Sequence, residues 1–273
     1  MKTKQLKGKA IYSPKGKAGE YAKYACNFYV GCSNDCDYCY CKRGLQGHAM
    51  GGTTPTLKKC FKDEHDAYKS FIREVQNNIN EFRKHGIFFT FTSDTLLPET
   101  QQLTNTAVLY AVAQGVPCKL LTKRADFKIP QSFYDYTDLI AYGFTLTGIN
   151  SLELHASTNA KRIDTMRHLH NRGFKTFASI EPIINLKSSM AMIKKTVDCC
   201  NLYKIGLISG EKLTYTWFEV ERFYMEVNDL LKYNMPQPKV YWKNSLLKYI
   251  DRDRVQLLDS IFVNADYNIF NNK

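Results

Sequence analysis

The stretch Gly31-Cys32-Ser33-Asn34-Asp35-Cys36-Asp37-Tyr38-Cys39-Tyr40 holds three cysteines, separated by three residues and then by two. Thiolate sulfur is the soft ligand that iron–sulfur clusters use. A cubane has four irons, so three cysteines leave one iron without a protein ligand, and an open position is typical of metal sites that do chemistry. Gly31 gives the backbone the freedom to turn at the entry of the loop. The loop therefore predicts a cluster with one iron open to a further ligand.

Two other interpretations of the cysteine loop remain open at this point. A fourth cysteine, either Cys26 or Cys41, would close a zinc site, although zinc ribbons use two distant C-x2-C pairs and this chain has one. Alternatively, the cysteines are small buried residues without a metal. The odd number of cysteines and their clustering argue against a disulfide framework and favour a reducing compartment. The nine are Cys26, Cys32, Cys36, Cys39, Cys41, Cys60, Cys118, Cys199 and Cys200.

The composition is that of a globular protein. Of the 273 residues, 44% are hydrophobic and 23% are charged, which is enough apolar material for a packed core. No apolar run approaches the roughly 20 residues of a membrane span, and no apolar stretch follows the basic residues 1–7. We therefore expect a cytoplasmic protein that does not interact with a membrane. The net charge of +12 favours a polyanionic partner such as nucleic acid, or only keeps the surface hydrated; both interpretations remain open.

Short apolar strands alternate with amphipathic helices along most of the chain. Strands are predicted over residues 24–30, 87–92, 117–121, 138–146, 174–180 and 203–208, and helices over residues 64–84, 99–114, 159–172, 188–199 and 217–232. Such alternation predicts a parallel sheet with helices packed outside it. We expect a basic arm over residues 1–20, the α/β domain that holds this sheet over 21–235 and a cap on the same domain over 236–273.

The pattern around the cysteines resembles a known family. The motif Tyr24-x-x-Asn27-x-Tyr29-x-Gly31-Cys32-x3-Cys36-x-Tyr38-Cys39-Tyr40 is similar to the spore photoproduct lyase-like branch of the radical S-adenosylmethionine (SAM) superfamily. The resemblance implies an α/β fold, a partial (β/α)6 TIM-type barrel. It implies a [4Fe–4S] cluster on Cys32, Cys36 and Cys39, together with SAM. It also implies an electron donor of the flavodoxin or ferredoxin type, reductive cleavage of SAM, and abstraction of a hydrogen atom from the substrate.

Barrel enzymes collect their site residues at the carboxyl ends of the strands. The second strand ends in Thr92-Ser93-Asp94, where a hydroxyl and a carboxylate would bind the ammonium of SAM, or would cap the next helix. The third ends near Lys123, which matches a basic family residue that contacts the SAM carboxylate, or is a solvated surface residue. Tyr38, beside the last cysteine, is also expected at the cofactor.

Three later strand ends supply weaker candidates. Thr145 has a hydroxyl for the ribose, or is an ordinary β-branched strand residue. Ser179 and Glu181 precede Pro182, and the carboxylate is a candidate ligand for the ribose or the substrate. Gly210 would allow close approach of the adenine. The basic helix at 159–172 is expected to be a solvated face, with nucleic-acid contact as the alternative.

Three hypotheses about the function remain open: two differ in the substrate of a radical SAM enzyme, and the third is not an enzyme. The first is a nucleic-acid base, the second a peptide or small metabolite, and the third a non-catalytic, metal-bearing nucleic-acid binder. The resemblance implies that repair members of the family have one further cysteine beyond the cluster motif, which returns a hydrogen atom to the substrate radical. Cys41 lies too close in sequence to Cys39 to reach across the barrel mouth easily. Cys60 precedes the first helix, in a segment that we do not place in the mouth, and Cys118 begins a strand, at the opposite end of the barrel. We therefore predict no efficient repair of spore photoproduct.

Overall fold

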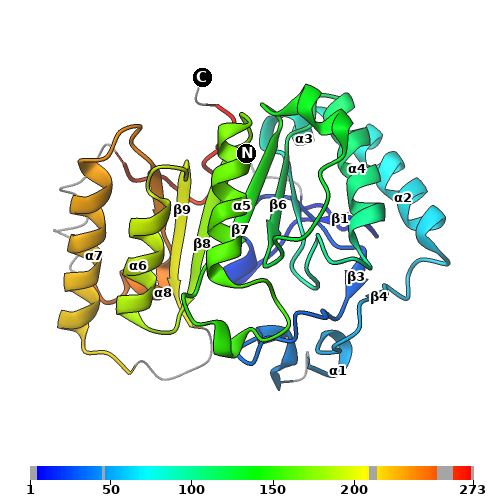
Figure 1. Ribbon diagram of the computed structural model, residues 1–273. Coiled ribbons are helices and arrows are strands. Elements are labelled where there is room, and N and C mark those ends of the chain that lie inside the picture. The colour runs from blue at the N-terminus through cyan, green and yellow to red at the C-terminus, as the bar shows by residue number, and fades with distance from the viewer. Residues whose placement is uncertain (1–4, 45–46, 209–213, 251–260, 272–273) are drawn as a thin grey trace.

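The computed structural model describes residues 5–44, 47–208, 214–250 and 261–271 (Figure 1). Its main feature is one sheet of eight strands in the order β1-β2-β5-β6-β7-β8-β9-β10. Neighbours from β2 to β10 are parallel, and only β1 pairs antiparallel. The strands are β1 (Ile11–Tyr12), β2 (Ala25–Cys26), β5 (Ile87–Phe89), β6 (Cys118–Thr122), β7 (Ile140–Thr145), β8 (Lys175–Ile183), β9 (Leu202–Leu207) and β10 (Lys239–Trp242).

Helices cover the outer face of this sheet, as Figure 1 shows. The α-helices are α1 (Gly47–Met50), α2 (Glu64–Asn77), α3 (Ile79–His85), α4 (Gln101–Ala113), α5 (Asn159–Asn171), α6 (Leu186–Thr196), α7 (Trp217–Lys232) and α8 (Asn244–Leu247). Short 3-10 turns are η1 (Gly16–Ala18), η2 (Tyr40–Lys42), η4 (Gln131–Tyr136) and η5 (Asn150–Leu152). The strand–helix alternation and the parallel order confirm the predicted partial barrel. No helix in these ranges is both long and apolar enough to cross a membrane.

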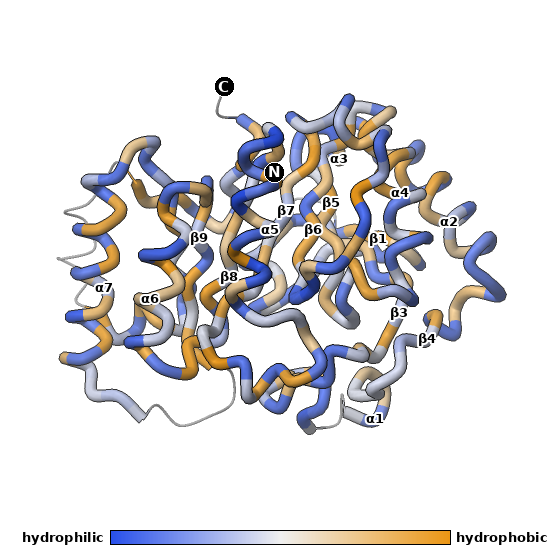
Figure 2. Tube along the Cα trace, viewed as in Figure 1, coloured by the Kyte–Doolittle hydropathy of each residue, from blue (hydrophilic) through white to orange (hydrophobic). Residues whose placement is uncertain are grey.

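The two faces of each strand serve different purposes because side chains alternate across a strand. On β6, Cys118 and Leu120 point outward into the large core beneath the helices, where Figure 2 shows hydrophobic residues gathered. The inner face carries a smaller cluster that includes Phe88, Phe177 and Ile269. Gly143 on β7 is required there, because a Cβ atom would lie 2.1 Å from the Phe177 ring. Polar side chains occupy the rest of the interior.

The predicted strand over residues 24–30 is wrong in its continuity. It divides into β2 and β3 (Tyr29–Val30), and β3 pairs with β4 (Thr56–Leu57) in a separate two-stranded sheet. Asn27 lies at the break and ties three segments together: its amide group donates to the Tyr12 hydroxyl at 2.9 Å, and its carbonyl accepts from Thr90 and from Phe91 N. The break turns the chain from the sheet into the cysteine loop.

The predicted helix over residues 64–84 is also interrupted. Asn78 has φ −131° and ψ 25°, so α2 ends before it and α3 begins after it. Its side chain donates to the carbonyl of Glu74 at 2.9 Å, which satisfies one of the last carbonyls of α2.

Candidate active site

A cavity of about 390 Å³ opens at the carboxyl ends of the parallel strands. The cysteine loop forms one side of it, and residues from the N-terminal segment, β8 and the turn after β10 form the other. Eleven of the twelve site residues named from the sequence line this cavity: Cys32, Cys36, Cys39, Tyr38, Thr92, Ser93, Asp94, Lys123, Thr145, Ser179 and Glu181. A volume of this size suits a small organic ligand.

The cysteine loop is held against residues 52–54. Gly31 has φ +82°, and a Cβ atom there would lie 2.5 Å from the Thr54 carbonyl oxygen, so only glycine fits. The Cys32 amide donates to the carbonyl of Gly52 at 2.9 Å. The loop therefore enters the cavity in a fixed direction.

The three thiols sit in unequal environments. Burial raises the pKa of Cys32 to about 12 and also raises the pKa of Cys36. The neighbouring Cys41 thiol lowers the pKa of Cys39 to about 6, against the opposing effect of burial, and Lys123 adds to the lowering. Metal ligation deprotonates thiols, so an electropositive neighbour favours the ligating form.

The donor set fits a cubane cluster. Three free cysteines project from one loop into one cavity, and each would bind a different iron. Among the described residues, no three His, Cys, Asp or Glu side chains converge closely enough for one metal ion. A mononuclear tetrahedral zinc ion needs such convergence, whereas a cubane spreads its ligands over separate irons.

Asp94 is saturated with internal hydrogen bonds. Its buried carboxylate accepts from the amide nitrogen of Lys123 and the Asn34 side chain, both at 2.7 Å, from the Thr122 hydroxyl at 2.7 Å and from Leu96 N at 3.0 Å. Four donors occupy the acceptor positions of a carboxylate. These contacts favour a positioning role, in which Asp94 joins the cysteine loop to the ends of two strands, over direct contact with a ligand.

Lys123 and Ser93 keep polar atoms available. The Lys123 ammonium lies 5.5 Å from the centre of the Tyr38 ring, and it donates no hydrogen bond to any residue that the structure describes. Burial lowers the pKa of Lys123, but the facing Tyr38, Cys36 and Glu153 outweigh this, so the pKa is raised overall and the side chain is charged. The buried Ser93 hydroxyl has no hydrogen-bond partner either. An orphaned hydroxyl in a cavity wall fits a polar ligand.

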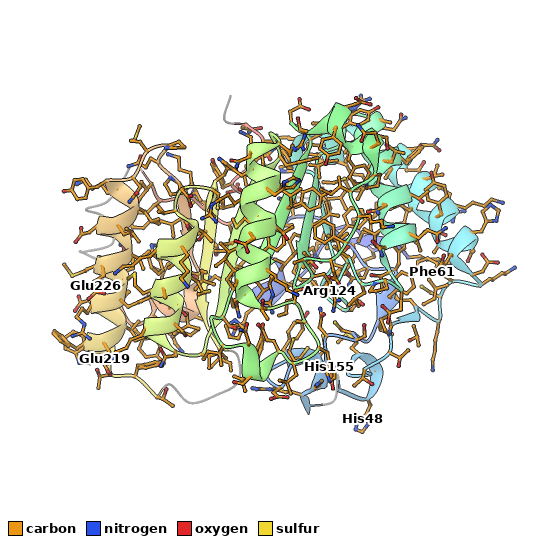
Figure 3. The ribbon with its side chains drawn as sticks, in the orientation of Figure 1. His48, Phe61, Arg124, His155, Glu219 and Glu226 are labelled. Carbon is orange, nitrogen blue, oxygen red and sulfur yellow. The ribbon has the colours of Figure 1, made fainter. Side chains whose placement is uncertain are left out.

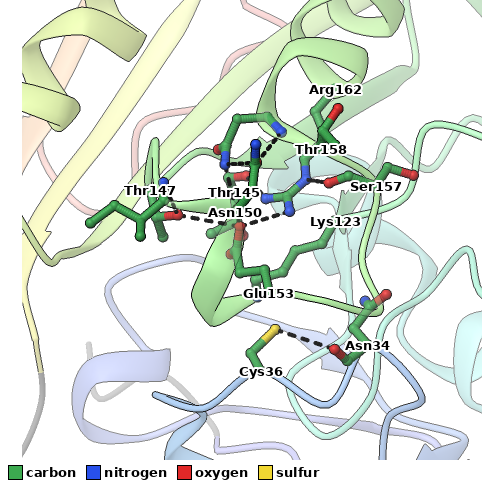
Figure 4. A network of polar contacts seen from close by, with 12 residues as sticks. Asn34, Cys36, Lys123, Thr145, Thr147, Asn150, Glu153, Ser157, Thr158 and Arg162 are labelled. Carbon is green, nitrogen blue, oxygen red and sulfur yellow. Dashed lines mark hydrogen bonds and ion pairs between the residues drawn. The ribbon is translucent and has the colours of Figure 1, made fainter.

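Tyr38 contacts a buried polar network around Glu153 and Arg162, and Figure 4 shows these two residues with their neighbours. Its hydroxyl donates to Glu153, and the other Glu153 oxygen accepts from Arg162 at 2.7 Å. The Arg162 guanidinium also donates to the carbonyls of Ser157 and Thr145, each at 2.7 Å. The cysteine loop is thus tied to η5, α5 and the end of β7.

The expectation of a solvated basic face on 159–172 is wrong for Arg162. That side chain is fully buried and ion-paired, because Glu153 lies beneath it. Arg167 binds Asp198 at 3.1 Å on the surface. The helix is therefore partly a structural support of the site.

The wall opposite the cysteines is built from Tyr21, Ser179, Glu181 and Lys243. The Tyr21 hydroxyl lies 2.6 Å from Ser179 Oγ and donates to Glu181 at 2.7 Å. The sequence analysis missed Tyr21 and Lys243, as it missed Asn34, Glu153 and Arg162. Of these five residues, only Asn34 had a signal in the sequence, because it lies within the cysteine loop. The candidate Gly210 lies outside the described residues.

The remaining cysteines are placed differently from one another. Cys41 lines the cavity beside the other loop cysteines, and its thiol donates to the Phe91 carbonyl at 3.7 Å. Cys60 is exposed, and Cys118 is buried in the outer core.

Thr92, another site residue named from the sequence, uses its hydroxyl within the protein. It donates to the Tyr29 carbonyl at 2.6 Å.

Residues 26–200 match the radical SAM superfamily, and the chain belongs to that superfamily. Over 256 residues it is 25% identical to "Uncharacterized protein MJ0683" of Methanocaldococcus jannaschii, with 90% of each chain covered. A mutant of spore photoproduct lyase has a similar fold, with a TM-score of 0.64, 15% identity, and 88% of this chain and 80% of that chain covered. Streptococcus suis SuiB bound to S-adenosylmethionine gives a TM-score of 0.55 at 11% identity over 81% of this chain. The chain spans half the length of SuiB.

Membership identifies the class of protein. The chain is an enzyme of the radical SAM type, with a [4Fe–4S] cluster and SAM as its cofactors and an electron donor as a general requirement of the class.

Proposed function

We propose that Cys32, Cys36 and Cys39 hold the cluster and that SAM occupies the cavity between them and the Glu181 wall. The observation that carries this proposal is the shared cavity, which brings together the cysteines, a charged Lys123 and an orphaned Ser93 hydroxyl. Lys123 would bind the SAM carboxylate, and Ser93 would hydrogen-bond the amino-acid part. Glu181 would accept from the ribose hydroxyls.

The protein's own residues supply binding, orientation and protection. When bound, the reduced cluster supplies the electron that cleaves SAM and so starts hydrogen abstraction from the substrate. Asp94 and Glu153 hold the cysteine loop in place from two directions, through Asn34 and Tyr38. Tyr21 and Lys243 close the opposite wall and limit access of water to a reactive site.

The direct test is reconstitution without oxygen. Wild-type protein given iron, sulfide, SAM and dithionite should release methionine and 5′-deoxyadenosine, and Cys36→Ala should release neither. Zinc bound stoichiometrically by four cysteines, with no SAM cleavage, would contradict the proposal.

We propose a nucleic-acid base as the substrate class, and a reducing cytoplasm with a flavodoxin- or ferredoxin-type donor as the setting. Support comes from the net charge of +12 and from the similar fold of spore photoproduct lyase. Arg124, next to the cavity-lining Lys123, is engaged within the protein: it binds Asp126 and the carbonyl of His155, and Figure 3 labels both Arg124 and His155. Long-range attraction, rather than a preformed phosphate site, is therefore the expected mode.

Affinity for single-stranded DNA and RNA, measured against salt concentration, tests this substrate class. Binding that weakens steeply with salt supports it. Affinity that is absent at low salt favours the peptide or small-metabolite hypothesis, and binding without any SAM cleavage favours the non-catalytic one.

Spore photoproduct repair has its own experiment. A dinucleotide spore photoproduct incubated with reduced enzyme and SAM should yield little thymine, because the Cys41 thiol is engaged with a backbone carbonyl. Repeated turnover that disappears in Cys41→Ala would instead identify Cys41 as a hydrogen-atom donor.

A further inference from the structure

Lys243 is a buried cation whose hydrogen bonds are all directed into the protein. It follows β10 and is 1% exposed. Its ammonium contacts Glu181 Oε2 at 2.7 Å, Glu20 Oε2 at 3.3 Å and the carbonyl of Lys17 at 3.3 Å. The Glu181 and Lys17 contacts are hydrogen bonds, and the Glu20 contact is an ion pair. The ammonium of Lys243 is therefore engaged with the protein, although the residue lines the cavity.

Glu181 is the opposite case. Its Oε2 atom accepts from both Lys243 and the Tyr21 hydroxyl, at 2.7 Å each. Its Oε1 atom receives no hydrogen bond from any described residue, and the side chain lines the cavity. One oxygen is thus fixed by the protein, and the other is open to a hydrogen-bond donor in the cavity.

The surroundings hold this pair in a single arrangement. Gly206 on β9 leaves the space, because a Cβ atom there would lie 2.9 Å from Lys243 Cδ and 3.2 Å from Glu181 Oε1. Glu20 anchors Lys243 from the other side, and its Oε1 accepts from Asn244 N at 3.0 Å and from the Tyr241 hydroxyl at 3.2 Å. The pair is therefore assembled from four separate parts of the chain.

We infer that Lys243 is a positioning residue for SAM, which holds Glu181 as a charged acceptor with one oxygen aimed at hydroxyl donors in the cavity. This inference rests on the proposed function. Without Lys243, Glu181 Oε2 would keep only the Tyr21 hydroxyl as a partner, and the direction in which Oε1 points would no longer be fixed. The segment beyond residue 236, expected from the sequence to be a cap, then contributes directly to the cofactor site.

The experiment is a double-mutant cycle on SAM affinity, measured by equilibrium binding to the reconstituted, unreduced protein. Glu181→Gln should weaken SAM binding about 10–150-fold, the loss of one charge-assisted hydrogen bond. Lys243→Met should weaken it to a similar extent, and the double variant should be no worse than the poorer single one. Lys243→Arg, which keeps the charge, should recover part of the affinity. Lys119→Met, a buried lysine on the inner face of β6 outside the cavity lining, is the matched control and should bind SAM like wild type.

The outcomes separate this inference from the proposed function. A wild-type protein without a cluster or SAM cleavage would overturn the proposed function. A wild-type protein that cleaves SAM, with unchanged SAM affinity in Lys243→Met or losses that add in the double variant, overturns the inference alone. Iron content and thermal unfolding accompany each measurement. Should Lys243→Met fail to fold, Gly206→Ala replaces it: the added methyl group displaces the pair, so SAM affinity falls if the inference is correct and stays unchanged if it is wrong.

Discussion

The hydroxyl of Tyr38 donates a hydrogen bond to the carboxylate of Glu153, which lies 115 residues further along the chain. This contact joins the cysteine loop to the buried Glu153–Arg162 ion pair. Tyr38→Phe keeps the ring and removes only the donor. We expect it to destabilise the folded protein by about 1–2 kcal/mol and to speed loss of iron to a chelator. Denaturant unfolding and the rate of bleaching measure the two effects; Tyr233→Phe, at an exposed tyrosine, should change neither. Iron loss at the wild-type rate would show that the contact does not hold the loop.

The cluster ligands can be separated from the other cysteines. Single alanine variants of Cys32, Cys36 and Cys39 should lose the brown colour and the wild-type content of about four irons per chain. Cys60→Ala, at an exposed cysteine outside the cavity, is the matched control and should retain both. Iron analysis and visible absorption provide the measurement. Loss of metal in Cys41→Ala as well would point to a fourth protein ligand.

Lys123 offers a test of the SAM-binding side. Lys123→Met keeps the aliphatic chain over Tyr38 and removes the charge. SAM affinity should fall about 10–150-fold while iron content stays the same, because one charge-assisted contact worth roughly 1.5–3 kcal/mol is lost. Lys128→Met, at an exposed lysine of the same connection, should bind SAM normally. Equal affinities in the two variants would refute the assignment.

Asp94 should behave as a positioning residue. Asp94→Ala leaves four donors without their acceptor and should destabilise the protein by about 2–4 kcal/mol, with loss of iron as the cysteine loop loosens. Asp94→Asn keeps part of the acceptor capacity and should cost less. Urea denaturation and iron content distinguish the variants. A stable Asp94→Ala protein that retains iron and fails only to bind SAM would show direct contact with the ligand instead.

Lys119 should make the stability depend on pH. It is 8% exposed on the inner face of β6, and burial lowers its pKa to about 8. The unfolded chain holds this proton up to about pH 10.4, so between about pH 8 and about pH 10 the unfolded state binds more protons. The free energy of unfolding should therefore rise with pH in this window. Below about pH 8 both states are protonated, so the slope vanishes while the full cost of burying the charged lysine remains.

Removing the buried charge gives the comparison. Lys119→Met should raise the unfolding free energy at neutral pH and flatten its increase toward about pH 10. Denaturant titrations at a series of pH values provide the measurement, with Lys128→Met as the control. An unchanged slope in Lys119→Met would mean that Lys119 takes up its proton equally in both states.

The sequence predicted the cysteine loop and the strand-end residues because both depend on local order. Spacing along the chain determines the loop, and a parallel sheet brings the carboxyl ends of its strands to one edge whatever lies between them. Glu153, Arg162 and Lys243 gave no such signal. Each owes its role to a partner on another element, and a charged residue that pairs inside the fold has the same local pattern as one in water. Glu20 even lies in the segment 1–20, which its composition led us to predict as a basic arm.

The place of Lys243 also determines when the site can exist during synthesis. The ribosome delivers the cysteine loop early and the residue that completes the opposite wall late. A nascent chain can present Cys32, Cys36 and Cys39 while β10 is still unmade, so the thiols are exposed to iron donors and oxidants before the cavity has its far wall. The order of the chain itself therefore allows a cluster to be delivered before the cavity is closed.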